Sequence, residues 1–316
     1  MGSSRHSAPP VLVIGSANVD ISVSTAVLPR RGETVIGNSS LITVGGKGAN
    51  QAVASAACGA ATHFAGRVGA DTFGRMLQEA LRSRGVRVEE LKATPKEATG
   101  IATISVEDSG KNCIIVVPGA NACLEAADLD ELAPLFETAA LVVLQCEIPM
   151  DTAYRAIELG AAAGKPVILN PAPFRGLDLR RIAGAVTYLI PNEMEASQMS
   201  GMPVDTVDQA MQCAIWLHAQ GIECVVITLG AQGCVAVDGE SARHLAGHIV
   251  PAIDTTGAGD AFVGCLAAAL ATGRLREESI RRALLYSALS TTRRGAQVSY
   301  PEGAEFERAW NGLSTA

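Results

Sequence analysis

Short apolar runs recur along this 316-residue chain, and they constrain its fold more than any other feature. Each run has about the length of a buried strand, and helical patterns lie between the runs. The clearest helix spans residues 72–84, with Asp71 as a candidate N-cap and Gly85 as a candidate terminating residue. This alternation predicts an α/β fold with a mostly parallel central sheet and helices on both faces. The runs cover residues 11–15, 141–145, 167–169, 188–190 and 224–229.

Two regions break the alternation and have the pattern of antiparallel strands. Polar and apolar residues alternate over residues 18–24, which puts Asn18 and Asp20 on the same face of a strand. A hairpin is predicted around a turn at residues 108–110, and it is too small to be stable alone. We therefore expect one α/β domain over residues 11–302, with a small β-sheet lid and terminal extensions at 1–10 and 303–316. The expected lid segments are approximately residues 17–24, 34–44 and 98–118.

Charge and composition narrow the range of partners. The formal net charge is −7, whereas nucleic-acid binders present a basic face, so no nucleic-acid partner is expected. No apolar run approaches the roughly 20 residues that span a bilayer, and residues 1–10 lack a signal-peptide core, so a cytoplasmic protein without membrane contact is expected. The eight cysteines form no C-x-x-C pair and are interpreted as small core residues. His244 and His248 have metal-ligand spacing only on a helix, and their segment has an extended pattern.

The first polar motif is a glycine-rich turn over residues 45–50, GGKGAN, before a helical pattern. Its glycines allow the backbone to approach a ligand closely, and Lys47 and Asn50 supply donors suited to hydroxyl groups. It is not a nucleotide P-loop, because Gly48 follows Lys47 where a P-loop has Ser or Thr. A purely structural turn remains the alternative.

The second motif, DTTGAGD, covers residues 254–260 and leads into an apolar helix. Small residues at a helix N-terminus leave N–H groups that favour an anion. Asp260 would repel a phosphate there unless it has a task of its own, and accepting a proton from an attacking hydroxyl is such a task. The alternative is a carboxylate that only complements the helix dipole.

The third motif pairs Asn192 with Glu195 after an apolar run. On a helix, the two residues lie one turn apart, within reach of a hydrated magnesium ion and phosphate oxygens. The same spacing is typical of a helix cap, which is the alternative.

Together, these motifs resemble the ribokinase (phosphofructokinase-B) family of carbohydrate kinases, in order and spacing, over residues 11–301. The resemblance extends to residues 32–34, 170–173, 228–230 and 294–297. It implies ATP-dependent phosphorylation of D-ribose at its 5-hydroxyl, with Asp260 as the general base. The other implied roles fall into five groups. The anion hole is Gly257, Ala258 and Gly259; the ribose contacts are Asn18, Asp20, Gly46, Lys47, Asn50 and Glu147; the ATP contacts are Asn192, Thr228, Gly230, Gly233 and Gly259. Glu195 corresponds to the Mg²⁺ shell, and Asp254, Thr256, Ser290, Arg293, Gly295 and Ser299 to a K⁺ site.

The resemblance leaves some alternatives open. Leu284 lies where some family members have a histidine beside adenine, which affects only a polar contact to the base. A 2-deoxyribose kinase is the main alternative, followed by nucleoside and hexose kinases, and Asn18 discriminates because its amide can bind the hydroxyl that deoxyribose lacks. A catalytically silent sugar or nucleotide sensor is the alternative from another class. The family usually forms dimers through the lid, so a homodimer is expected.

Overall fold

The computed structural model describes residues 9–313, and its centre is a ten-stranded sheet. The strand order is β14-β13-β12-β11-β10-β9-β1-β4-β5, with β6 paired to β4. All pairs from β12 to β5 are parallel, and β13 and β14 add an antiparallel edge. The predicted parallel α/β sheet is therefore confirmed. The strands are β1 Val11–Ile14, β4 Thr62–Gly69, β5 Val86–Arg87, β6 Leu91–Thr94, β9 Leu141–Gln145, β10 Val167–Asn170, β11 Tyr188–Leu189, β12 Cys224–Thr228, β13 Cys234–Asp238 and β14 Ala242–Leu245.

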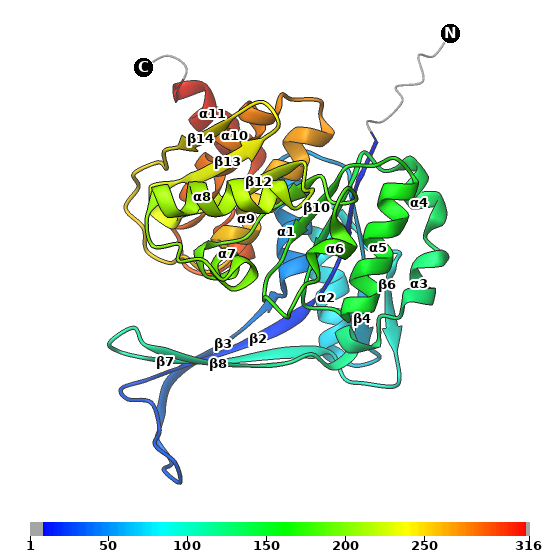
Figure 1. Ribbon diagram of the computed structural model, residues 1–316. Coiled ribbons are helices and arrows are strands. Elements are labelled where there is room, and N and C mark those ends of the chain that lie inside the picture. Colours follow the sequence, from blue (N-terminus) through cyan, green and yellow to red (C-terminus); the bar gives the residue numbers. More distant parts are fainter. Residues whose placement is uncertain (1–8, 314–316) are drawn as a thin grey trace.

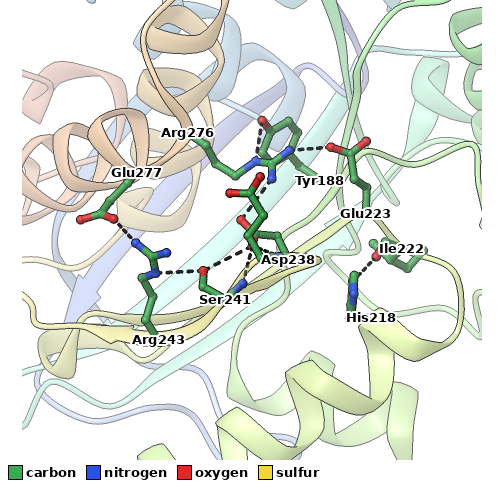
Figure 2. Close-up of polar contacts among 10 residues, drawn as sticks. Tyr188, His218, Ile222, Glu223, Asp238, Ser241, Arg243, Arg276 and Glu277 are labelled. Atoms are coloured by element: carbon green, nitrogen blue, oxygen red, sulfur yellow. Dashed lines mark hydrogen bonds and ion pairs between the residues drawn. The ribbon is translucent and has the colours of Figure 1, made fainter.

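Helices cover both faces of this sheet and enclose two hydrophobic cores (Figure 1). Alternate residues of β1 supply the two cores: Val11 and Val13 face one, Leu12 and Ile14 the other. The first core is covered by α1 Lys47–Ala57, α2 Thr72–Ser83, α9 Ala258–Ala271, α10 Arg276–Ser290 and α11 Gly303–Leu313. The second is covered by α3 Ala126–Asp130, α4 Ala133–Thr138, α5 Met150–Ala162, α6 Leu179–Ile182, α7 Glu193–Ser200 and α8 Val207–Ala219. Three short 3₁₀ turns complete the described fold: η1 Gly119–Cys123, η2 Gly230–Gln232 and η3 Gln297–Ser299.

The local signals of α2 act as the sequence predicts. The Asp71 side chain accepts a hydrogen bond from the Gly74 amide at 2.8 Å, which caps the first turn, and Gly85 follows the helix with φ of 81°. The C-terminal helix differs from expectation, because residues 303–313 were assigned to an extension and instead form α11. Its Phe306 is buried and packs edge-on against Tyr286, with the ring centroids 5.1 Å apart. The expected N-terminal extension lies outside the described residues up to position 8.

Helices α1 and α9 pack directly against each other because Gly264 has no side chain. A Cβ at Gly264 would lie 2.5 Å from the Cβ of Ala54 and 2.5 Å from the carbonyl oxygen of Gln51. These distances are too short for any larger residue. The close approach matters for the site, because α1 and α9 begin with the first and second motifs.

A second, four-stranded sheet projects from the body as the expected lid (Figure 1). It consists of β2 Asn18–Thr25, β3 Gly37–Gly45, β7 Gly100–Glu107 and β8 Asn112–Val117, in the order β3-β2-β7-β8. The β2–β3 and β7–β8 pairs are antiparallel, as expected, whereas β2 and β7 are parallel. The parallel pair arises because both strands leave the body at the same end, with Asn18 beside Gly100. Within residues 9–313, every helix is too short or too polar to cross a membrane.

Candidate active site

The carboxyl ends of β10, β11 and β12 and the N-termini of α1 and α9 enclose a cavity of about 200 Å³. This edge of a parallel sheet is where ligands of open α/β folds bind. All three sequence motifs contribute to the cavity, although the first lies more than a hundred residues from the other two in the chain. The lining includes Lys47, Asn170, Asn192, Glu195, Thr228, Gly257, Ala258, Gly259 and Asp260.

The last three residues of the second motif form the first turn of α9, which begins at Ala258, earlier than the predicted apolar stretch. Gly257 is the N-cap with φ of 75°, and a Cβ there would lie 2.7 Å from the Cβ of Ala296. The Tyr300 hydroxyl donates to the Gly257 carbonyl at 3.1 Å, and the Ser287 hydroxyl donates to the Ala258 carbonyl at 2.8 Å. The turn is therefore fixed by glycine stereochemistry and by two hydroxyl donors.

The amide groups of this turn differ in availability. The Ala258 N–H donates to the Thr255 carbonyl at 3.2 Å, so it is already engaged. The N–H groups of Gly257 and Gly259 have no hydrogen-bond partner among residues 9–313. Free amides at the positive end of a helix dipole suit an anion. Of the expected anion hole, Gly257 and Gly259 are thus the available donors.

Asp260 is buried and accepts a hydrogen bond on each carboxylate oxygen. Asn50 Nδ2 donates to Oδ2 at 2.9 Å, and Gln51 Nε2 donates to Oδ1 at 3.0 Å. Burial raises the pKa of Asp260 above its usual value, while Lys47 and the two amide donors oppose that rise. The pKa of Lys47 is raised in turn: burial lowers it, but the carboxylates of Asp260, Glu147 and Glu195 outweigh burial. The arrangement suits a proton acceptor beside a fixed positive charge.

The lid contributes Asn18 and Asp20 to the same region. Asn121 Nδ2 donates to Asn18 Oδ1 at 2.7 Å, which leaves Asn18 Nδ2 as the available donor. Burial raises the pKa of Asp20 to about 6, with further contributions from Glu147 and Asp260. The structure therefore brings Asp20 within electrostatic range of the predicted base, and Asn18 lies two residues before Asp20 on the same strand.

Glu147, which follows β9, ties the first motif to the start of β2. Its Oε2 accepts from the Ser16 hydroxyl at 2.6 Å and from the Lys47 amide at 3.2 Å. Gly46 has φ of 89°, and a Cβ there would collide with the backbone of residues 16–18. The glycine-rich turn is thus required for the fold, as the structural interpretation of this motif predicts, and its role in ligand binding stays a prediction.

The structural alternative for the third motif, a helix cap, is present at Asn192 and Glu195. Asn192 Oδ1 accepts from the Glu195 amide at 2.8 Å, and Glu195 Oε2 accepts from the Asn192 amide at 3.0 Å, which is a capping box at the start of α7. Both residues line the cavity, and burial raises the pKa of Glu195. Thr228 lies beside them through an isolated bridge to Asn192.

Gly230 and Gly233 lie in the turn after β12 and do not line this cavity. Gly233 has φ of 95°, and a Cβ there would collide with the Leu245 carbonyl, so its glycine is needed for packing. Leu284 lines a separate cavity of about 220 Å³, together with Ala246, His248, Arg281, Trp310 and Leu313. Leu284 lies one helical turn before Ser287, which contacts the anion-hole turn.

The predicted K⁺ ligands are only partly joined by contacts. Asp254 Oδ1 accepts from the amide and hydroxyl of Thr256 at 2.9 and 2.7 Å, and Oδ2 accepts from the Gly295 amide at 2.8 Å. The Ser290 and Ser299 hydroxyls donate to carbonyls within their own turns. The Arg293 side chain forms an ion pair with Glu305.

Several buried polar residues of the site received no role from the sequence. They are Ser16, Gln51, Asn121, Gln145, Asn170 and Gln297, and each forms a hydrogen bond within the site. A usable signal exists for Gln145 and Asn170, because each is a polar residue at the carboxyl end of an apolar run. Asn121 and Gln297 carry no comparable local signal, since long-range folding alone brings them to the site.

Comparisons with known proteins agree with this geometry. Residues 9–303 match the pfkB family carbohydrate kinase. The chain is 37% identical over 297 residues to a deoxyribokinase of Salmonella typhimurium, covering 94% of this chain and 97% of the relative. It is 37% identical over 302 residues to a ribokinase of Mus musculus, covering 94% and 93%. The structure of an Arabidopsis thaliana ribokinase complexed with ribose and ATP superposes with a TM-score of 0.88 at 34% identity, covering 95% of this chain and 98% of that one. The fold, the site and these matches together show that the chain belongs to the pfkB family of carbohydrate kinases.

Proposed function

We propose that this kinase transfers the terminal phosphate of ATP to the 5-hydroxyl of D-ribose. The observation that carries the choice of sugar is the orientation of Asn18. Because Asn121 occupies its Oδ1, the Asn18 amide offers an N–H donor to a bound ligand. The 2-hydroxyl of ribose can accept from this donor, whereas 2-deoxyribose would leave it unpaired.

In the proposed reaction, Asp260 takes the proton of the 5-hydroxyl as the sugar oxygen bonds to the γ-phosphorus. The bond from that phosphorus to the β-phosphate oxygen breaks, and ADP leaves with the electron pair. The free amides of Gly257 and Gly259 stabilise the charge on the transferred group. Lys47 supplies positive charge on the same side of the cavity.

The proposed ions fit the donor sets present. Glu195 is a buried carboxylate in the cavity, and its Oε1 is not used by the capping box, so it is suited to hold Mg²⁺ through water. The magnesium ion would neutralise charge on the phosphates. Asp254 and neighbouring carbonyl and hydroxyl oxygens would hold K⁺, and that binding would order the loop that leads to Gly257. The apolar side chain of Leu284 in the second cavity is proposed to face adenine.

A second candidate substrate is 2-deoxyribose, because the Salmonella relative with 37% identity is named a deoxyribokinase. The test is ADP release with ribose, 2-deoxyribose, hexoses and nucleosides, in the presence of ATP, magnesium and potassium. We expect the highest kcat/KM with ribose. A higher value with 2-deoxyribose would reverse the assignment of the sugar, and binding of ATP without turnover of any sugar would indicate the sensor.

The outer part of the lid supports the proposed homodimer. Many large apolar side chains are exposed on its strands, and an exposed apolar surface of this kind is typical of an interface. Sedimentation velocity at several concentrations should show a dimer, and a monomer throughout would contradict this proposal. The exposed side chains of the lid are Val23, Leu41, Ile42, Ile114, Ile115, Val116 and Val117.

The proposed setting of this kinase is the cytoplasm.

A further inference from the structure

Asp260 is the meeting point of two chains of amide side chains. In the first, here called the Gln51 relay, Gln145 Nε2 donates to Gln51 Oε1 at 2.6 Å and Gln51 Nε2 donates to Asp260 Oδ1 at 3.0 Å. In the second, the Asn50 relay, Gln297 Nε2 donates to Asn50 Oδ1 at 2.9 Å and Asn50 Nδ2 donates to Asp260 Oδ2 at 2.9 Å. All four amides are buried. Each carboxylate oxygen thus receives one relay.

The charge on Asp260 fixes the direction of both relays. An ionised carboxylate only accepts hydrogen bonds, so Gln51 and Asn50 must turn their N–H₂ groups toward it and their carbonyl oxygens away. Those oxygens then require donors, which Gln145 and Gln297 supply. Asn170 Oδ1 adds to this constraint, because it accepts from the same Gln51 nitrogen at 3.1 Å. Reversing any amide would place two acceptors in contact.

The fixed direction leaves an unpaired acceptor at the outer end of each relay. The buried side-chain atoms without a partner in residues 9–313 are Gln145 Oε1, Gln297 Oε1 and one nitrogen of Arg282. Two of these three are therefore relay ends. A buried acceptor without a donor destabilises the folded state. The fold nevertheless keeps two such acceptors, and both lie at the ends of the relays that orient one carboxylate.

We propose that Gln145 and Gln297 are positioning residues for phosphoryl transfer, which act through Gln51 and Asn50 to hold the Asp260 carboxylate ionised and aligned with the acceptor hydroxyl. The inference rests on the proposed role of Asp260 as the general base. During transfer, the hydroxyl proton moves to Asp260; afterwards the relay donors favour its release to water, because they stabilise the ionised form. Neither terminal glutamine contacts Asp260 itself.

Other charged groups also act on Asp260 and must stay constant in any test. Lys47 on α1 faces it with a positive charge, and Glu147 after β9 faces it with a negative one. Its charge in turn affects Asp20 on β2, Glu195 on α7 and Tyr300. The substitutions chosen below are neutral, so they alter the relays without altering these charges.

The test uses Gln145→Met and Gln297→Met, which remove the end donor of one relay each. We expect each to lower kcat by roughly 3- to 10-fold, with the KM values for sugar and ATP within about two-fold of the wild type. The acidic limb of the kcat–pH profile should move to higher pH, because weaker donation raises the pKa of Asp260. Folding should persist, since each substitution removes one unpaired acceptor and creates another at Gln51 or Asn50. Gln78→Met is the matched control, because this half-buried glutamine donates to the Leu91 carbonyl outside the site.

A double-mutant cycle separates the relay from packing. In an Asp260→Ala background, Gln145→Met should have no further effect on the residual rate, because the residue through which it acts is gone. An equal loss in both backgrounds, or an unchanged kcat and pH profile for both glutamine variants, would overturn the proposal. If one variant fails to fold, the other tests the same carboxylate from the opposite relay. The assay uses whichever sugar the wild type phosphorylates fastest, so a wrong sugar assignment leaves the result interpretable.

Discussion

Replacing Asp20 by asparagine should stabilise the protein above pH 6, although Asp20 is a proposed sugar contact. Burial, followed by the charges of Glu147 and Asp260, raises its pKa from 3.8 to about 6. The folded state therefore holds a proton that the unfolded state has already lost between these pH values. As pH rises through this window, the folded state loses stability relative to the unfolded chain. Asparagine cannot ionise, so the variant avoids the loss.

The size of the effect follows from the pKa values. A rise of about two pKa units, at about 1.4 kcal/mol each, corresponds to about 3 kcal/mol over the whole window. About 1.5 of those units fall between pH 4.5 and pH 8. The free energy of unfolding of the variant should therefore rise by about 2 kcal/mol relative to that of the wild type over this range. Comparing two pH values removes the constant difference in packing and hydrogen bonding between the two side chains.

Urea unfolding of both proteins at pH 4.5 and pH 8 measures this difference. The sugar kcat/KM of the variant should fall at the same time, since the proposed sugar contact loses its charge. The reasoning is refuted if the difference in unfolding free energy between the two proteins is the same at both pH values. In that case, Asp20 would titrate in the folded protein as it does in the unfolded chain.

Three further predictions concern the chemistry. Asp260→Ala should lower kcat by at least ~10²-fold while ATP affinity measured by calorimetry stays within about two-fold, because a general base contributes ~10²–10⁴-fold; near-normal turnover would remove Asp260 from the mechanism. Potassium should raise the initial rate more than sodium or a bulky organic cation at constant ionic strength, because the proposed site offers oxygen ligands that suit a large, weakly hydrated ion; three equal rates would contradict that site. Asn18→Met should narrow or invert the preference for ribose over 2-deoxyribose, measured as the ratio of kcat/KM values, because methionine offers no donor. An unchanged ratio would mean that Asn18 does not read the 2-hydroxyl.

The elements of the fold could be predicted from the sequence where local signals are strong. The apolar runs became β1, β9, β10, β11 and β12, and α2 begins and ends within a residue of its expected limits. The parallel pairing of β2 with β7 was missed, because the direction of pairing depends on where each strand leaves the body. Side chains alternate between the two faces of a strand in parallel and antiparallel pairs alike, so the sequence pattern does not distinguish them. The helix α11 was missed because its stabilising contact, Phe306 on Tyr286, comes from tertiary packing.

The part of the candidate site that belongs to the three sequence motifs could be predicted. Asp260, Lys47, Asn192 and Glu195 line one cavity, as the motif spacing suggested. The amides behind Asp260 could not be inferred, since Gln297 meets Asn50 across a separation of 247 residues. A glutamine has no distinctive pattern in sequence, and only its partners show whether it is a surface residue or part of a buried network.

The contact at Gly264 constrains the catalytic chemistry more than it constrains substrate preference, so natural selection can act on these two properties separately. The helices α1 and α9 touch there, so the position of Lys47 and Asn50 relative to Asp260 depends on the rigid packing of two backbones. Asn18 and Asp20 belong instead to β2, which meets that helix pair at Gly46, the N-cap of α1, and then runs out into the lid. Substrate preference can therefore drift through changes in the lid while the chemistry is inherited intact. Descendants of one such scaffold can diversify in the sugars they accept, whereas a mutation at Gly264 would remove activity toward all of them.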